Sequence, residues 1–420
     1  MSTIKLVYRY LTDKMLSTTL NIVLLSLGIA VIFILISVGR QMEEKINSNS
    51  RGIDLVVGAK GSPLQLILCS IFHVDFPTGN IKLRDADELS QHRLIKSAIP
   101  LSMGDNFQGY RIVGTTRAYA DLYEGELATG DWFNKPMDVV VGVNVAERAG
   151  LHLGATFASS HGLTGEGEEH GTRFLVTGEM KRTNTVLDNL ILTPVESVWE
   201  VHHHEGEDES EEHEDEQDAH ESIAKNPYKL VPSVDRSDTT KEVTSLLVQF
   251  RNPIAAIQLP RYINSSTNMQ AASPAFETAR LFSILGVGVD VIAGFAGVLV
   301  LISGLSIFIV LYNAMRERRY DLAIMRTMGA SRATVFSSLV LEGAILTLTG
   351  SIVGLLFGHL SLYAFVQFVP EGGQIGLRPF MLLPEEAVVL AGSVGLGVIC
   401  SLLPATQAYR LNIHHVLAGN

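Results

Sequence analysis

The sequence is poor in cysteine, tryptophan and charged residues. Its 420 residues include two cysteines, two tryptophans and 18% charged side chains. Cys69 lies outside the long apolar runs and Cys400 lies within one, so the two cysteines are not expected to pair. A disulfide framework is therefore excluded.

The usual motifs of nucleotide hydrolysis and of hydrolases are also absent from the sequence. No G-x-x-x-x-G-K-S/T string occurs, and the nearest one, Gly58–Pro63, lacks the spacing with which backbone amides hold phosphates. Neither H-E-x-x-H nor G-x-S-x-G occurs. The sequence therefore predicts a chain that is not an enzyme and does not hydrolyse ATP by itself.

Four long apolar runs predict an integral membrane protein. Hydrophobic residues make up 47% of the chain and the mean hydropathy is +0.25, above the usual range of soluble proteins. The first run, Leu20–Gly39, has no charge and no small-residue cleavage site after it, so we expect a retained anchor rather than a signal peptide. The predicted transmembrane helices are residues 17–39, 284–311, 335–366 and 387–409.

Charge is distributed unevenly, and this asymmetry predicts the topology. Residues 40–280 carry 22 Lys+Arg against 36 Asp+Glu, or −14, so the other residues contribute +2 to the net charge of −12. Arginines concentrate between the second and third runs, and such loops stay in the cytoplasm. We therefore expect a cytoplasmic segment at 312–334, cytoplasmic termini and an extracytoplasmic domain at 40–280. The remaining predicted segments are a cytoplasmic amphipathic helix at 1–16, an outer loop at 367–386 and a cytoplasmic tail at 410–420.

The pattern of residues 40–280 predicts an α+β fold. Strand-type runs occur at Asp54–Val57, Tyr110–Gly114, Asp138–Gly142, Thr172–Thr177, Asn189–Thr193 and Ser245–Phe250. Helical patterns lie between them at Asp85–Lys96, Asn144–Ala149 and Pro194–Val201. The apolar stretch Gly52–Asp75 fits a core strand with a packed helix, or a surface element that faces a substrate or partner.

The arginine-rich segment has apolar side chains at helical spacing, which fits an interfacial anchor or a handle for another protein. Its string ERRYDLAIMRTMGASRATVF, followed by Glu342 and a glycine-rich helix, resembles the signature of FtsX-like permeases. This group of ABC transporters includes MacB, LolC/LolE and FtsX. The strings ELATGDWF, DVVVGVNVAERAGLHLGATF and TRFLVTGEMKRTNTVLDNLIL resemble, in this order, the MacB-type periplasmic core, and Pro404–Leu417 resembles the family's terminal element.

The resemblance implies a permease subunit in the bacterial inner membrane, paired with a second permease protomer as a homodimer or heterodimer. In this family the arginine-rich segment is a coupling helix that docks on a cytoplasmic ABC ATPase, whose ATP-driven cycle moves the outer domain. The residues implied at this contact are Glu317, Arg318, Arg319, Tyr320, Asp321, Met325, Arg326, Met328 and Gly329. A periplasmic adaptor or a lipoprotein is an implied partner, and nucleic acid is not. A regulator of a periplasmic hydrolase and a metal-responsive binding module stay open as alternatives.

Small residues and one carboxylate in the third run indicate close helix packing. Gly350, Gly354 and Gly358 repeat every four residues, a register that lets another helix approach closely. Glu342 lies in the same helix, and a carboxylate in an apolar bundle usually pairs with another group. We expect a packing role for Glu342, with proton transfer as the alternative.

The segment Val201–Glu221 departs from the family pattern, with eleven Asp/Glu, five His and no basic residue. Such a charged run predicts a disordered, solvated loop. Imidazole and carboxylate ligands together suit zinc and related ions. The candidate zinc ligands are His202, His203, His204, His213 and His220. An acidic solubilising loop is the alternative.

The predicted topology can be tested with cysteine labels at Ser331 and Ser210. Ser331 belongs to the segment expected in the cytoplasm and Ser210 to the acidic loop expected outside. A membrane-impermeant reagent should label the two positions from opposite sides of the membrane. Labelling of both from one side would contradict the four-span topology.

Zinc capture by the histidines can be tested by isothermal titration. Replacement of all five with glutamine should lower zinc affinity sharply, and binding should weaken as the pH falls through about 6.5, because neutral imidazole is the ligand. Identical isotherms with and without the replacements would leave the segment as an acidic spacer.

Overall fold

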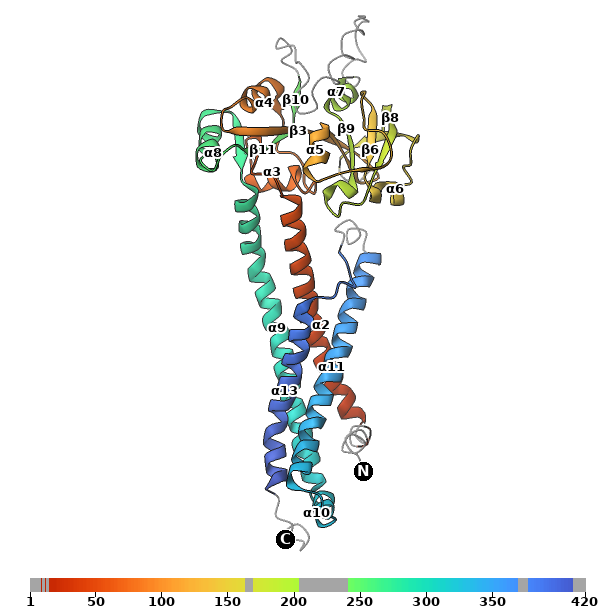
Figure 1. Cartoon of the computed structure of the whole chain (residues 1–420), viewed down its shortest axis with the longest axis vertical. Coiled ribbons are helices and arrows are strands. Elements are labelled where there is room, and N and C mark those ends of the chain that lie inside the picture. The colour runs from red at the N-terminus through yellow and green to blue at the C-terminus, as the bar shows by residue number, and fades with distance from the viewer. Residues whose placement is uncertain are drawn as a thin grey trace, which may run out of the picture. The chain divides into compact units, whose positions relative to one another are not determined.

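The computed structural model of the chain describes residues 15–162, 169–203, 241–368 and 377–410, together with Arg9 and Thr12. The chain divides into two compact units. One comprises Met1–Glu43 with Leu285–Asn420, and the other comprises Glu44–Ile284. Figure 1 shows that the first is built of long helices and the second of strands and short helices.

Four long helices in the described residues are long and apolar enough to cross a membrane. They are α2 (Met15–Asn49), the part of α9 (Pro274–Glu317) from Gly288 onward, α11 (Arg332–Phe368) and α13 (Pro384–Tyr409). The short helix α10 (Arg319–Thr327) connects α9 to α11. This arrangement confirms the predicted fold class of a four-helix membrane bundle joined to an α+β domain. Most of the predicted amphipathic helix 1–16 and the tail 411–420 lie outside the described residues.

The α+β domain contains a ten-stranded mixed sheet in the order β12-β1-β11-β3-β4-β9-β6-β8-β5, with β7 paired to β3 and β8. Its strands are β1 (Leu55–Ala59), β3 (Ile95–Phe107), β4 (Tyr110–Thr115), β5 (Leu127–Gly130), β6 (Asp138–Val141), β7 (Thr156–His161), β8 (Glu169–Met180), β9 (Leu190–Pro194), β11 (Ser245–Phe250) and β12 (Met269–Ala272). The strands β2 (Ile81–Lys82) and β10 (Glu242–Val243) form a separate pair. The helices are α3 (Pro63–Ser70), α4 (Leu83–Ser90), α5 (Arg117–Leu122), α6 (Val143–Ala149), α7 (Val195–His203) and α8 (Ala255–Ser266), with a 3-10 turn at Val186–Asn189.

Both faces of the sheet are buried, and strand β1 illustrates why. Its side chains alternate, because successive residues of a strand point to opposite faces. Val56 packs in a cluster with residues of α3 and α5, whereas Leu55 and Val57 pack in a second cluster with residues of α4 and α8. A third cluster gathers apolar side chains of β6, β7, β8 and α6. Continuous apolar runs in the sequence therefore mark strands covered on both sides.

Most of the predicted elements of this domain coincide with observed ones, but the predicted helix Asp85–Lys96 is wrong in its second half. Helix α4 ends at Ser90, and Ile95 begins the thirteen-residue strand β3. Pairing of β3 with β11 explains the difference, because Ile95 lies opposite Phe250 and, after a shift of register at Gln249, Ser97 to Leu101 pair with Gln249 to Ser245. The apolar stretch Gly52–Asp75 forms β1 and α3, whose apolar side chains lie largely in the core.

A chain of buried hydrogen bonds connects the interior of this domain to the end of α2. His73 Nε2 lies 2.8 Å from the Tyr119 hydroxyl, which is hydrogen-bonded to Tyr123. The Tyr123 hydroxyl donates to the Asn49 carbonyl at 2.8 Å, and the Asn49 side chain accepts from the Val186 amide at 3.1 Å. Because buried polar groups cost free energy unless paired, this network fixes the position of Asn49 in the domain.

Burial lowers the pKa of His73 from 6.5 to about 3, and the nearby Arg111 guanidinium is the smaller cause. The folded chain keeps His73 neutral while the unfolded chain takes up a proton below about pH 6.5. Stability contributed by His73 is therefore complete above that pH and is lost as the pH falls toward 3.

Replacement of His73 with glutamine should flatten the acid side of the stability profile. Between pH 6.5 and 4, the wild-type chain should lose up to about 1.4 kcal/mol per pH unit more than His73→Gln. The melting temperature of the full chain across this range measures the difference. His152→Gln is the control, because His152 is 66% exposed and should leave the slope unchanged. Equal slopes for wild type and His73→Gln would contradict the buried neutral histidine.

Candidate functional site: the α10 segment and the contacts of α11

The segment between α9 and α11 folds as a short helix with a sharp turn at each end. The backbone leaves helical geometry at Arg318, where α9 has ended and α10 has not begun. Gly329 has φ +101°, a left-handed conformation that glycine adopts without strain and that ends α10. Ser331 then accepts a hydrogen bond from the Thr334 amide at 3.1 Å and caps α11.

Helix α10 is amphipathic, and its apolar side is packed on the helical bundle. Leu322 is 4% exposed and belongs to a cluster with Met315, Val335 and Leu339 of the neighbouring helices. Ala405 completes the cluster from α13. The opposite side of the segment leaves large apolar side chains uncovered, since Tyr320 is 58% exposed and Met328 is 82% exposed.

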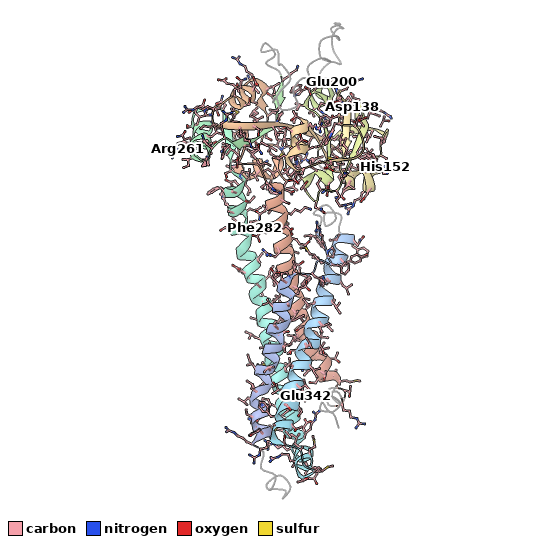
Figure 2. The ribbon with its side chains drawn as sticks, in the orientation of Figure 1. Asp138, His152, Glu200, Arg261, Phe282 and Glu342 are labelled. Atoms are coloured by element: carbon pink, nitrogen blue, oxygen red, sulfur yellow. The ribbon has the colours of Figure 1, made fainter. Side chains whose placement is uncertain are left out.

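A buried ion pair holds the start of α10 against α11. Arg318 Nη1 lies 3.7 Å from Glu342 Oε1, and the two side chains are 12% and 6% exposed. Figure 2 shows Glu342 at the α10 end of the bundle. Removal of one partner from a buried pair leaves an uncompensated charge and typically costs about 3–5 kcal/mol. The pair therefore fixes the position at which α10 leaves α9.

The predicted coupling residues differ in how far their side chains are exposed. Glu317, Arg319, Tyr320, Met328 and Gly329 are exposed, whereas Met325 and Arg326 are half-buried. Arg318 faces into the bundle toward Glu342. The side chain of Asp321 lies outside the described part of the structure. The exposed group can contact another protein, and Arg318 instead positions the helix that carries it.

The glycines predicted to pack a neighbouring helix lie against α2. A Cβ atom on Gly350 would lie 2.9 Å from Leu25 Cδ2, and one on Gly354 would lie 2.7 Å from the Ser26 carbonyl oxygen. Gly358 faces the ring of Phe33. Larger side chains at these positions would separate the two helices, because the contact is already at van der Waals distance.

A second close contact, between α11 and α13, was not predicted from the sequence. A Cβ atom on Gly343 would lie 2.7 Å from the Gly397 carbonyl oxygen. The hydroxyl of Ser351 donates to that of Ser393. Small residues at four-residue spacing could have indicated Gly343 and its neighbours, since Gly343, Thr347 and Ser351 continue one helical face.

The sequence also gave no role to a polar cluster at the opposite end of these helices. Nε2 of His359 in α11 lies 3.5 Å from Oε2 of Glu386 in α13. Gln41 of α2 accepts from the Arg378 amide at 2.7 Å and donates to the Arg378 carbonyl at 3.3 Å. A lone histidine and a glutamine within or beside apolar helices were the available signals.

The side chains of all five candidate zinc ligands lie outside the part of the chain that the structure describes. His204, His213 and His220 lie outside the described residues. His202 and His203 end helix α7, and their side chains are outside the description. In the described ranges, no group of three or more His, Cys, Asp or Glu side chains is arranged to hold a metal ion.

The contact between α2 and α11 can be tested with one substitution at two matched positions. Gly354→Ala places a methyl group against Ser26 and Ile29 and should destabilise the chain by about 1–3 kcal/mol. Gly392→Ala in α13 meets no atom within 4 Å and should be neutral or slightly stabilising. Thermal unfolding of the two variants in lipid nanodiscs measures the difference. Equal melting temperatures would contradict a close α2–α11 contact.

Comparison with known proteins gives two family matches that together span most of the chain. The family described as FtsX-like permease C-terminal matches residues 293–413. The family described as MacB-like periplasmic core domain matches residues 18–258, which is more than half of the chain.

Three relatives illustrate the range of similar proteins. An uncharacterized ABC transporter permease of Methanocaldococcus jannaschii is 28% identical over 33% of this chain and 34% of its own length. The macrolide export ATP-binding/permease protein MacB of Rhodopirellula baltica is 24% identical over 44% of this chain and 28% of its own. The lipoprotein-releasing system transmembrane protein LolE of Haemophilus influenzae is 28% identical over 29% of this chain and 33% of its own.

The matches cover about a third of these relatives. A solved structure, the extracellular domain of the noncanonic ABC-type transporter YknZ from Gram-positive bacteria, aligns over 53% of this chain and 99% of that chain with 12% identity and a TM-score of 0.28. The two family matches, in the same order as the α+β domain and the last three membrane helices, show that the chain belongs to the FtsX-like permeases with a MacB-like periplasmic core domain.

Proposed function

We propose that this chain couples ATP hydrolysis by a separate cytoplasmic ABC ATPase to movements of its own α+β domain. Helix α10 is the contact with the ATPase, and the domain of residues 44–284 lies in the periplasm. A second permease protomer, identical or related, completes the transporter. Substrate is then moved by displacement of the periplasmic domains, and a macrolide-like molecule or a lipoprotein is the candidate class, since these are named for two of the relatives.

The observation that carries this proposal is the two-sided character of the α10 segment. Its inner side is fixed by the cluster around Leu322 and by the Arg318–Glu342 pair. Its outer side presents Tyr320, Ile324 and Met328, which are 58%, 37% and 82% exposed. An interfacial anchor would explain the uncovered apolar side chains but not a buried ion pair that fixes the start of the helix. A rigidly held helix with uncovered aromatic and Met side chains suits a protein interface.

Two other functions remain as alternatives to transport. The chain could regulate a periplasmic hydrolase through the same mechanical coupling, in which case a hydrolase rather than an adaptor or lipoprotein would co-purify with it. Zinc capture by the histidine-rich segment would add a metal response to either function, and the composition of residues 201–221 supports that proposal.

Alanine at Tyr320 and Met328 should weaken stimulation of the ATPase by the permease. Loss of large interface side chains costs more than about 1 kcal/mol each, so the concentration of permease needed for half-maximal stimulation should rise at least about tenfold for the double variant. ATPase activity of the purified partner, titrated with full-length permease in nanodiscs, gives this value.

Leu382→Ala is the matched control, because Leu382 is 80% exposed but lies just before α13, at the other end of the helices from α10. It should leave the titration unchanged. Unchanged stimulation by the Tyr320/Met328 double variant would reject α10 as the contact and would support a membrane anchor instead.

A further inference from the structure

A pair of ionisable side chains is buried where α11 meets α13 at the end of the bundle away from α10. His359 and Glu386 have side chains that are 11% and 12% exposed, and their Nε2 and Oε2 atoms are 3.5 Å apart. The His359 ring lies between aromatic neighbours, with its centroid 4.3 Å from that of Phe33 of α2 and 6.2 Å from that of Phe380. The pair therefore joins three segments of the bundle.

The hydrogen-bond partners of the imidazole determine where its hydrogen lies. His359 Nδ1 is 2.6 Å from the Pro379 carbonyl oxygen. A carbonyl oxygen only accepts, so Nδ1 must carry a hydrogen. A neutral imidazole has a single N–H group, and its Nε2 would then present a lone pair. That lone pair would face the Glu386 carboxylate, which is also an acceptor.

The second oxygen of Glu386 is already used at the start of α13. Its Oε1 accepts a hydrogen bond from the Leu383 amide at 2.9 Å and so caps the start of α13. Rotation of the carboxylate away from His359 would break this cap. The two acceptors therefore stay opposed unless a hydrogen lies between Nε2 and Oε2.

The described contacts of the neighbouring groups at this end are made with residues other than Glu386. On α2, Arg40 is 3.2 Å from Glu385 of α13 and 3.6 Å from Glu43. The backbone of Arg378 is held by Gln41, and the Tyr363 ring of α11 packs on Phe380. The contacts described at this end thus give the Glu386 oxygen facing the histidine no cation other than His359.

We propose that His359 and Glu386 form a proton-binding site that fastens α11 to α13 on the periplasmic side of the membrane. The site holds one proton more than a neutral histidine and a carboxylate, either as imidazolium with carboxylate or as imidazole with carboxylic acid. With this proton, Nε2 and Oε2 share a hydrogen bond. Without it, two acceptors repel each other in a buried position, and the contact between α11, α13 and the segment before α13 weakens. The proposal goes beyond ATP coupling, because it makes the contact between α11 and α13 depend on the pH of the periplasm.

The sign of the pH effect follows from proton counting. The folded chain holds the proton at pH values where the unfolded chain has released it, so folding takes up a proton. Stability from this site is therefore greater at low pH than at high pH. The melting temperature of the full chain should accordingly contain a component that falls with rising pH.

The test compares the full-length chain in lipid nanodiscs with three variants between pH 5.5 and 8.5. Glu386→Gln keeps the cap, because an amide oxygen accepts from the Leu383 amide, and its NH₂ group donates to the neutral imidazole. This variant should melt close to wild type at pH 5.5 and should lose the fall with rising pH. His359→Gln should also lose the fall and should melt lower than wild type at pH 5.5.

Glu385→Gln is the matched control, because it alters the adjacent carboxylate, which pairs with Arg40 and makes no described contact with His359. It should keep the wild-type pH dependence. The difference between the profile of wild type and that of each variant isolates the site from the other histidines of the chain. A Glu386→Gln profile parallel to wild type, or an equal flattening by Glu385→Gln, would overturn the proposal.

Discussion

The buried ion pair between Arg318 and Glu342 is the interaction on which the position of α10 depends. A guanidinium in an apolar bundle must be paired, and Glu342 on α11 lies within ion-pair distance of it. Because the pair lies at the break between α9 and α10, it sets the direction in which the short helix leaves the bundle. Packing of Leu322 then determines which side of α10 stays exposed. The exposed side of α10 is thus connected to α11 through this charged contact.

Helix α11 is in close contact with helices on two sides. Gly354 and its glycine neighbours bring its backbone against α2, whereas Gly343 brings it against Gly397 of α13. Lipid chains are as apolar as leucine, so helices in a membrane associate mainly through this kind of close packing. At the far end of α11, His359 adds a polar contact with α13. One helix therefore connects the α10 segment to the opposite end of the bundle.

The sequence predicts the features that depend on neighbouring residues and misses those that depend on distant ones. Apolar runs, arginine distribution and the glycine repeat are local patterns, and they indicated the four long apolar helices, the charged segment between two of them and the close packing of α11. Strand β3 was not predicted because its sequence contains Pro100. Proline has no amide hydrogen to donate between strands, so its presence argues against a strand. The pairing of β3 with β11, which starts 150 residues after the start of β3 (245 − 95), supplies the stabilisation that no local pattern shows.

The candidate site shows the same division between local and distant information. A helix with exposed and buried sides was predictable from the spacing of Leu322 and Met325, but the inward direction of Arg318 was not. Only the fold brings Glu342 to it, and only the fold brings Glu386 to His359. Both carboxylates are ordinary members of their helices by sequence, and their roles follow from partners on other helices.

The most direct test of this account is a charge swap at the buried pair. Arg318→Glu and Glu342→Arg should each reduce both accumulation in the membrane and ATPase stimulation, because each places like charges in contact. The double variant should recover most of both, with an interaction free energy well above about 1 kcal/mol, as expected for residues in contact. Losses that simply add in the double variant would show that the two side chains act independently, and would contradict the claim that their ion pair positions the coupling helix.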